Sequence, residues 1–181
     1  MNNFIRTYGG SSSSQASMRI NKEYGALLDS KEFSNIKIDY ENGSNIYVWI
    51  VRIDISRYHL SDRLIRDFEI YASRYGKPKE VKFEIRFNSN YPNDPPFVRI
   101  ISPRFSFRTG HVTIGGSICT EGLTKNGWNP QRTIENILVE IFLNVEVGNG
   151  SLDINGSNYD YQLNEALNAF NRSLIVHGWR F

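Results

Sequence analysis

The chain has 181 residues, 40% hydrophobic and 13% aromatic, a size and composition that fit one compact domain with a sizeable core and exclude a disordered chain. Its formal net charge of +2 gives no sign of a basic surface of the extent that nucleic-acid binding requires, and its longest apolar run, 46–51, is too short to cross a bilayer. A single cysteine cannot form an internal disulfide, and no Cys/His cluster has the spacing of a metal site, so we expect a metal-free protein of a reducing compartment.

The chain begins with a stretch rich in glycine and serine, residues 9–14, which has little apolar surface to bury. We therefore predict that residues 1–16 are a flexible Ser/Gly-rich tail and that residues 17–181 form the folded domain. The first part of this domain predicts an amphipathic helix, because its apolar residues recur at helical spacing: Ile20, Tyr24, Leu27 and Leu28.

Four β-strands are predicted after this helix, because β-branched and aromatic residues alternate there with polar ones. The predicted strands cover 36–40, 46–55, 81–87 and 97–101. The polar stretch between the second and third strands has no clear period beyond a helical turn near 64–71. The short links and the one-sided patterning indicate an antiparallel meander with one face exposed to solvent.

The rest of the chain consists of a loop-rich region and two helices. Three prolines exclude regular structure from 91–96, and 102–130 has frequent glycine and no sustained period, although it is too apolar to be disordered. Two apolar stripes then predict helices over 134–145, capped by Thr133, and over 163–174, ending near Gly178. The predicted class is α+β: an N-terminal helix, a four-stranded antiparallel meander, a long active-site loop and C-terminal helices.

Three motifs of the loop-rich region resemble those of one known family. They are Tyr91-Pro92-Asn93-Asp94-Pro95-Pro96-Phe97, Gly115-Gly116-Ser117-Ile118-Cys119 and Gly127-Trp128-Asn129-Pro130. In this order and spacing they look like the core of a ubiquitin-conjugating enzyme domain. The resemblance extends over nearly everything from Ser17 onward and includes the predicted order of helices and strands.

Two features make the chain similar to one branch of that family. Most members carry His-Pro-Asn before the cysteine, whereas His111-Val112-Thr113 stands there in this chain, without the proline and the asparagine. The segments 121–128 and 155–179, the second of which closes on His177-Gly178-Trp179, are similar to the Q-type conjugating enzymes. That branch also lacks His-Pro-Asn.

The resemblance implies an acyltransferase that works through a cysteine thioester. Cys119 would accept the terminal carbonyl of ubiquitin, or of a ubiquitin-like protein, from an activating enzyme and pass it to a lysine amine of a protein substrate, usually with a ligase. A thiolate can take an acyl group from a thioester at little cost, so the residue must be a cysteine. No cofactor is implied, because the upstream activating enzyme uses the ATP. We expect a monomer in the cytoplasm or the nucleus, with no nucleic acid and no membrane as partner.

Five residues of the surrounding loops are candidates to support this chemistry: His111, Thr113, Glu121, Asn126 and Asp153. The family's asparagine is credited with steadying the oxyanion or ordering the loop, and removing an oxyanion donor typically costs about 3–4 kcal/mol. Thr113 occupies the sequence position of that asparagine, and Asn126 is a second candidate by residue type. His111 is expected to brace the loop, while Glu121 and Asp153 would orient the incoming ammonium or act as a gate. The alternative for each of these residues is that it is an ordinary loop residue or a solvent-exposed charge with no role in the reaction.

The resemblance also implies contacts with partner proteins. Arg19 and Lys22 match the basic positions of the first helix that dock the activating enzyme, and the alternative is an ordinary solvated face. Ligase binding is assigned to paired loops, whose exposed aromatic and proline side chains would be binding anchors: Pro95, Pro96, Phe97, Trp128 and Pro130. For Trp128 the alternative is a packing role beneath the active-site segment.

Two other functions stay open at this point. A catalytically weak or inactive variant would act as a ubiquitin-binding module, although such variants usually lack the cysteine. A cysteine hydrolase would pair Cys119 with His59, His111 or His177, but no helical pattern follows the cysteine as it does in papain-like enzymes. Without the motifs, a lone cysteine is most simply a small buried hydrophobic residue.

Overall fold

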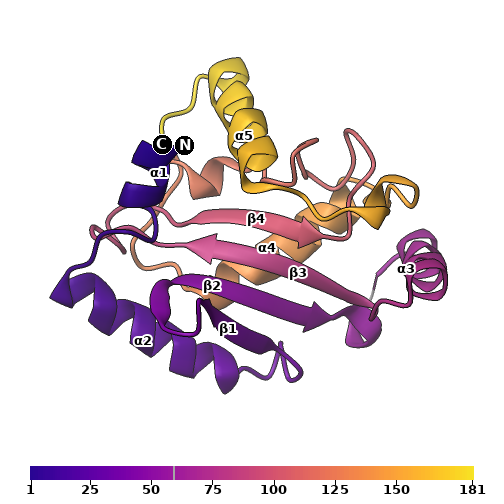
Figure 1. Ribbon diagram of the computed structural model, residues 1–181, viewed down its shortest axis with the longest axis horizontal. Helices are drawn as coiled ribbons and strands as arrows, with labels where there is room; N and C mark the ends of the chain where they lie inside the picture. The colour runs from indigo at the N-terminus through magenta and orange to yellow at the C-terminus, as the bar shows by residue number, and fades with distance from the viewer. Residues whose placement is uncertain (59) are drawn as a thin grey trace.

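The computed structural model describes residues 1–58 and 60–181, so His59, one of the histidines considered for the hydrolase, lies outside the described residues. The α-helices are α1 (Asn2–Thr7), α2 (Ser14–Leu28), α3 (Asp62–Tyr75), α4 (Ile134–Val147) and α5 (Leu163–His177). The strands are β1 (Lys37–Glu41), β2 (Asn45–Asp54), β3 (Glu80–Arg86) and β4 (Phe97–Ser102). Short 3-10 helices cover η1 (Ile55–Arg57), η2 (Glu121–Leu123) and η3 (Gly156–Asn158). Figure 1 shows their arrangement.

The sheet is the predicted antiparallel meander, with strand order β1-β2-β3-β4. The register places Trp49 opposite Ile85 and Phe83 opposite Ile100, so the large apolar side chains of neighbouring strands meet on one face. Helix α4 runs behind the sheet (Figure 1) and contributes Ile137, among other residues, to the same buried core. The α+β class and its order of elements are confirmed.

The two C-terminal helices begin and end as their sequences predict. Thr133 caps α4 through a reciprocal pair of hydrogen bonds with Asn136, and its hydroxyl accepts from the Asn136 N–H at 3.1 Å. At the start of α5, Glu165 Oε2 accepts from the Gln162 N–H at 2.7 Å. Gly178 ends α5 in the left-handed conformation, with φ 69°.

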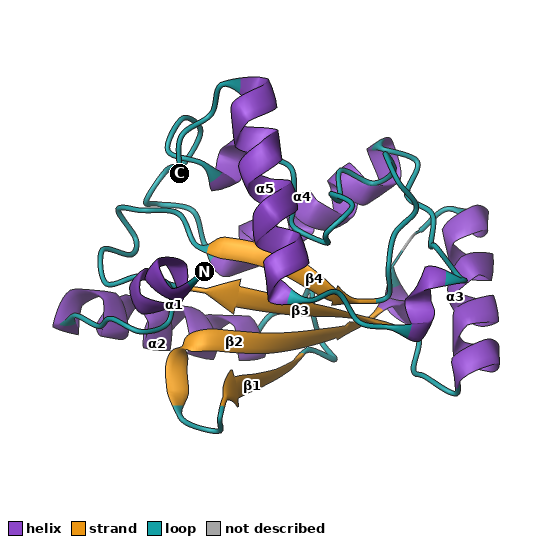
Figure 2. Ribbon diagram, turned by 45° about the horizontal axis from the view of Figure 1, so that its top comes forward, coloured by secondary structure: helices purple, strands orange, loops and turns teal. Residues whose placement is uncertain are grey.

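The second face of the sheet is exposed to solvent only in part. Lys37 and Asp39 of β1 are exposed as predicted, but the part of this face formed by β3 and β4 is covered. Glu84, Arg86 and Arg99 lie on this face and are only 4%, 4% and 6% exposed. Figure 2 shows α1 and α5 on the side of the sheet opposite α4, where they cover this face. The charges are compensated in place, because Arg99 donates to Glu84, and Arg86 donates to Glu84 at 2.8 Å and to Glu41 at 2.9 Å. The alternation of β3 was read correctly, but its charged side chains pair with one another instead of meeting water.

The N-terminal segment, expected to be a tail, carries helix α1 and a buried aromatic residue, Tyr8, which is 6% exposed. Phe4 and Tyr8 pack with Phe97 and Phe181 in a small aromatic cluster. The Ser/Gly composition of 9–14 concealed these partners, because they come from β4 and from the chain end. The division into a tail, 1–16, and a domain, 17–181, stays a prediction.

Helix α3 is longer than the helical turn predicted near 64–71. Its apolar stripe, Leu64, Phe68 and Tyr71, is buried, while the polar residues between them face outward. Its other contacts are polar: Asp67 accepts from the Leu152 N–H at 2.9 Å, and the Tyr75 hydroxyl donates to the Ile154 carbonyl at 2.6 Å. Within 1–58 and 60–181, no helix is both long enough and apolar enough to span a bilayer.

Candidate active site

The segment that carries Cys119 is fastened to the edge of the sheet. The Ile100 N–H donates to the Gly116 carbonyl at 2.8 Å, and the Ile118 N–H donates to the Val98 carbonyl at 3.2 Å. One residue further, the Cys119 N–H donates to the His111 carbonyl at 2.9 Å. The cysteine therefore sits on an extended segment with a fixed backbone, although no regular strand was predicted there.

Two glycines allow this segment to pack closely against the start of α5. A Cβ at Gly115 would lie 2.1 Å from the Glu165 carbonyl oxygen, and a Cβ at Gly116 would lie 2.6 Å from the Tyr161 ring. Gly116 also has φ 89°, a conformation that L side chains rarely adopt. The Gly-Gly pair before Ser117 thus brings the cysteine segment against the C-terminal helix.

Helix α5 brings a titratable side chain next to the cysteine. His177 Nε2 lies 3.9 Å from Cys119 Sγ, although the two residues are 58 positions apart in the chain. The ring of Trp179 stacks on that of His177, with centroids 4.3 Å apart and planes inclined by 20°. Cys119 is free and partly exposed, so its thiol is accessible to a reactant. A nucleophile with an imidazole beside it is the arrangement that acyl-transfer chemistry uses.

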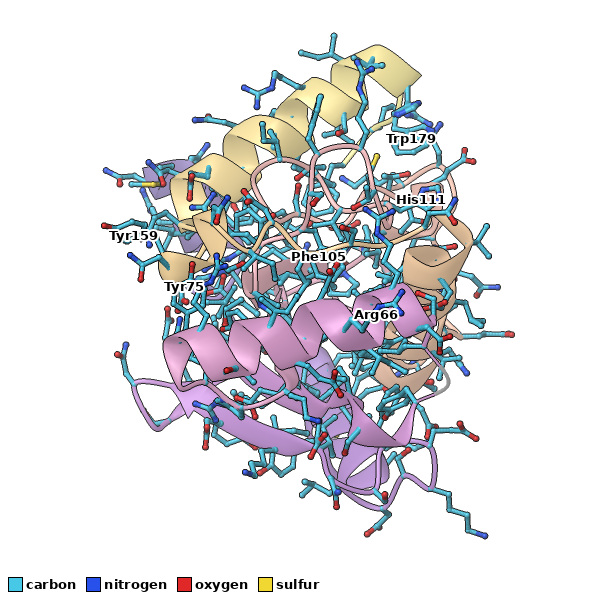
Figure 3. The ribbon with its side chains drawn as sticks, turned by 90° about the vertical axis from the view of Figure 1, so that its right-hand side faces the viewer. Arg66, Tyr75, Phe105, His111, Tyr159 and Trp179 are labelled. Carbon is cyan, nitrogen blue, oxygen red and sulfur yellow. The ribbon has the colours of Figure 1, made fainter. Side chains whose placement is uncertain are left out.

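A groove of about 520 Å³ opens beside the thiol. One wall is the loop around 107–114, the other is the last half of α5, and both histidines, His111 and His177, line it. Figure 3 looks onto this side of the molecule, with the loop of His111 between α5 above and α3 below and with Trp179 near the end of α5. Within the described residues, no group of three or more His, Cys, Asp or Glu side chains is placed to hold a metal ion.

His111 and Thr113 lie close to the cysteine, in the turn that precedes it. The His111 carbonyl accepts the Cys119 N–H, and its backbone has φ 54°. The Thr113 hydroxyl hydrogen-bonds the Ser117 hydroxyl at 2.7 Å, and its N–H donates to the Ser117 carbonyl at 2.9 Å. Both residues therefore hold the loop in shape.

The other three candidates occupy different surroundings. Asn126 Oδ1 accepts from the Arg180 N–H at 2.9 Å, so this side chain fastens the chain end to the loop after the cysteine. Glu121 is exposed and begins η2, two positions beyond Cys119 in the sequence. Asp153 is exposed, accepts from the Gly156 N–H at 3.0 Å, and is not among the residues that line the groove. Of the five candidates, only His111 and Thr113 line the groove with Cys119.

The ligase-loop assignment assumed exposed side chains, and for its first loop this assumption is wrong. Pro95, Pro96 and Phe97 are buried, and Phe97 is 1% exposed. Phe97 meets Phe4 and Phe170 edge to face, with ring centroids 5.0 Å and 5.4 Å away. Segments far away in the sequence cover this side chain, which a local motif cannot reveal.

The second loop offers some exposed surface. Trp128 is partly buried, and its Nε1 donates to the Pro92 carbonyl at 2.7 Å, so it ties the two loops together. Pro130 is exposed. Its carbonyl accepts from Arg19 at 3.1 Å.

Arg19 and Lys22 of α2 differ in their surroundings. Arg19 pairs with Glu23 at 2.6 Å and donates to the Arg132 carbonyl at 2.8 Å, so it joins α2 to the loop before α4. Lys22 is exposed. Of the two, only Lys22 fits a freely solvated basic position.

His177 is the residue near the cysteine that sequence reasoning did not place there. No cationic residue neighbours Cys119 along the chain, and His177 entered only through its similarity to Q-type chain ends and as one of three histidines for a hydrolase. The closing His177-Gly178-Trp179 was the available signal, because Gly178 ends the helix at the point where the histidine faces the thiol.

The sequence comparisons agree with this geometry. The family model described as ubiquitin-conjugating enzyme matches residues 73–159. The ubiquitin-conjugating enzyme E2 Q1 of Homo sapiens is 30% identical over 174 residues, which cover 93% of this chain and 40% of that protein. The ubiquitin-conjugating enzyme E2 25 of Caenorhabditis elegans is 28% identical over 173 residues, which cover 91% and 43%. The chain thus spans about two-fifths of the length of these curated relatives.

Solved structures share the architecture. A crystal structure of ubiquitin conjugating enzyme E2 from Plasmodium falciparum superposes with a TM-score of 0.53 and 28% identity, covering 72% of this chain and 84% of that chain. Human ubiquitin-conjugating enzyme E2 G1 superposes with a TM-score of 0.51 and 18% identity, covering 72% and 94%, which shows a likeness of fold. The motifs around the cysteine, the meander with its flanking helices and the sequence relatives agree, and the chain belongs to the ubiquitin-conjugating enzyme family, in its Q-type branch.

Proposed function

We propose that this chain accepts ubiquitin, or a ubiquitin-like protein, as a thioester on Cys119 and passes it to a lysine amine of a protein substrate. The observation that carries the proposal is the accessible Cys119 thiol on a segment fastened to β4, with His177 Nε2 3.9 Å from its sulfur. A buried, purely structural cysteine would have neither the groove nor the imidazole beside it.

In the first step, the Cys119 thiolate attacks the thioester carbonyl that the activating enzyme presents. A new C–S bond forms, the old C–S bond breaks, and the activating enzyme leaves as a thiolate. The exchange is close to neutral in free energy, because one thioester replaces another. The fixed backbone of Cys119 reduces the entropy that must be lost when the two sulfurs meet.

In the second step, the lysine nitrogen forms a C–N bond to the carbonyl, the C–S bond to Cys119 breaks, and the sulfur leaves as a thiolate. Lysine is an ammonium at neutral pH and the amide keeps one N–H, so two protons must depart, one before the attack and one as the amide forms. The His177 imidazole lies beside the sulfur and can accept one of these protons as a general base, while solvent takes the other. Trp179, stacked on the ring, holds the imidazole in this position.

The oxyanion of the tetrahedral intermediate has no dedicated side-chain donor among the two residues considered for it. The Thr113 hydroxyl is engaged with Ser117, and the Asn126 side chain is engaged with Arg180. We infer that both act through the shape of the loop. The loop-bracing role expected of His111 fits its carbonyl bond to the Cys119 N–H.

The partner contacts are part of the proposal. The activating enzyme would dock on α2 at Lys22, which is exposed, whereas Arg19 would help only by holding α2 against the loop before α4. A ligase would contact the loop of Trp128 and Pro130. We also propose that the protein works as a monomer in the cytoplasm or the nucleus, without a cofactor of its own.

The test is thioester formation with activating enzyme, ATP and ubiquitin, read on a non-reducing gel. We expect an adduct that reductant removes, that Cys119→Ala abolishes and that Cys119→Ser converts into a reductant-resistant oxyester. No adduct with ubiquitin or any ubiquitin-like protein would overturn the proposal, and ubiquitin binding without an adduct would then support the inactive variant. Hydrolysis of a ubiquitin ester in the absence of activating enzyme would instead identify a hydrolase.

A further inference from the structure

The groove beside Cys119 has a composition that the transfer reaction alone does not explain. Among its lining residues are two arginines, Arg108 and Arg172, and three exposed apolar side chains, Phe107, Ile114 and Val176, which are 62%, 55% and 78% exposed. The residues that line it include no aspartate and no glutamate. We call this surface the cationic groove.

The two arginines come from different walls, and the fold holds each in place. Arg108 has φ 60° and lies at the tip of the loop before His111, with its guanidinium 5.0 Å from the centre of the Phe107 ring. That loop is fastened at its base, because the Ser106 N–H donates to the Ser151 carbonyl at 2.8 Å and the Gly110 N–H donates to the Gly148 carbonyl at 2.9 Å.

Arg172 belongs to a stripe of α5 that faces the groove. Arg172, Ser173 and Val176 lie three, four and seven positions after Ala169, which places them on one side of the helix, and all four line the cavity. His177 follows on the same side of the helix and reaches the sulfur. This side of α5 therefore carries the charge of Arg172 and ends beside the Cys119 sulfur.

Neither of these arginines has an acidic partner within the described ranges, 1–58 and 60–181, unlike the arginines that the fold uses in ion pairs. Arg86, Arg99 and Arg104 all pair with glutamates. Arg108 and Arg172 form no ion pair with any described residue, and both are exposed. Two unneutralised guanidinium groups on opposite walls favour a ligand that brings carboxylates.

We infer that the cationic groove selects the acceptor: a substrate segment in which acidic residues and an apolar residue flank the lysine that receives the carried protein. This inference rests on the proposed transfer reaction and names its substrate class. The carboxylates would pair with Arg108 and Arg172, and the apolar residue would cover Phe107 and Val176. The acceptor enters on this side because His177, which takes the proton of the amine, lines the same groove.

The test uses the full chain loaded with ubiquitin and chased with three lysine peptides that differ only in the residues beside the lysine: acidic, neutral amide or basic. We expect the acidic peptide to discharge the thioester about threefold to tenfold faster than the neutral one at low salt, the range that one or two exposed ion pairs provide. The basic peptide should be slower than the neutral one, and added salt should reduce all these differences.

The decisive variant combines Arg108→Gln with Arg172→Gln. We expect it to form the thioester as before and to discharge the neutral peptide at an unchanged rate, while its preference for the acidic peptide disappears. The matched control combines Arg6→Gln with Lys79→Gln, which removes two exposed positive charges outside the groove and should keep the preference. Thermal unfolding of both double variants checks that each is folded.

The outcomes separate this inference from the proposed function. No thioester on the unaltered chain would mean that the proposed function has failed. Normal loading with equal rates for the three peptides would overturn only the acceptor inference. An equal slowing of all three peptides in the folded double variant would also overturn it, because the arginines would then hold the carried protein. Loss of loading in that variant would have the same consequence, since the arginines would act in the first step.

Discussion

His177 and Cys119 face each other across the groove, with 3.9 Å between Nε2 and Sγ. The imidazole is held by the end of α5 and by its stack with Trp179, while the sulfur is held by the hydrogen bonds of its segment to β4 and to His111. Two parts of the fold that lie 58 positions apart in the chain therefore meet at the reacting atom. His177 is the last residue of α5, and its ring stacks on Trp179, so a change in the residues after the helix can shift the imidazole.

His177→Asn should separate loading from discharge. The thiolate attacks an activated thioester in the first step, so loading should persist. Discharge onto lysine loses its general base, and we expect it to slow by about 100-fold at neutral pH. Single-turnover discharge of the preloaded chain at several pH values measures this effect. His111→Asn is the matched control, because asparagine tolerates the left-handed backbone at that position and keeps the carbonyl that holds Cys119. Equal discharge rates in the unaltered protein and in His177→Asn would exclude the base role.

Thr113→Val tests whether this hydroxyl acts on the loop or on the oxyanion. The change removes the hydrogen bond to Ser117, so we expect the free energy of unfolding to fall by about 1 kcal/mol. Discharge from a preloaded thioester should change little. Thr113→Ser, which keeps the hydroxyl, should restore the stability. A loss of discharge by 100-fold or more with unchanged stability would contradict this and would identify Thr113 as an oxyanion donor.

Asn126→Ala tests the connection between the chain end and the active-site loop. It removes the acceptor of the Arg180 N–H, next to Trp179, so we expect a loss of about 0.5–1.5 kcal/mol in unfolding free energy. We also expect slower discharge, because the ring stacked on His177 loses its support. Asn129→Ala is the control, since among the described residues the Asn129 side chain accepts from the nearby Gln131 N–H and from no distant segment. If both variants discharge at the same rate, the chain end does not position His177.

The elements of the fold could be read from the sequence because each depends on local patterns. The alternation in β3, the cap at Thr133 and the glycine after α5 are properties of short windows, and the structure shows all three. The length of α3 was underestimated, because only Leu64, Phe68 and Tyr71 mark its buried stripe and the rest of the segment is polar.

The surroundings of the site depended on contacts that no short window contains. His177 comes to Cys119 from 58 residues away, and Phe97 is covered by α1, α5 and the chain end. The buried charges of β3 have the same origin: Glu84 alternates as an exposed residue would, but its partner Arg99 lies on the next strand. The motifs identified the nucleophile, and the tertiary packing decided which other residues reach it.

Phe97→Ala should behave as a core mutation. The side chain is 1% exposed and packs against Phe4, Phe170 and Phe181, so its removal leaves a cavity. We expect a loss of about 3–5 kcal/mol in unfolding free energy, measured by urea denaturation. Phe107→Ala, at a position that is 62% exposed, is the control and should cost much less. An unchanged stability combined with lost ligase binding would restore Phe97 as a binding anchor.

The ion pair between Glu165 and Arg104 should make the stability of the domain depend on pH. Glu165 accepts from Arg104 at 2.8 Å and from the Gln162 N–H at 2.7 Å, at the point where α5 begins. Burial raises the pKa of Glu165, but the Gln162 N–H and the Arg104 guanidinium outweigh it and hold the pKa below its ordinary value of 4.5. A carboxyl whose pKa is lower in the folded state stabilises that state when it is ionised.

The lowered pKa of Glu165 determines how its contribution to stability changes with pH. The contribution of Glu165 is fully present above pH 4.5, the ordinary value, and is lost as the pH falls through the lower pKa of the folded state. We expect Glu165→Gln to cost about 0.5–1 kcal/mol near neutral pH, because the pair is partly exposed, with side-chain accessibilities of 20% and 37%. The difference should shrink toward zero in strong acid.

Thermal unfolding from neutral to acidic pH measures the difference between the unaltered protein and Glu165→Gln, with the exposed Glu69→Gln on α3 as the control. A difference that stays constant through the acid range would show that Glu165 acts through packing and not through its charge.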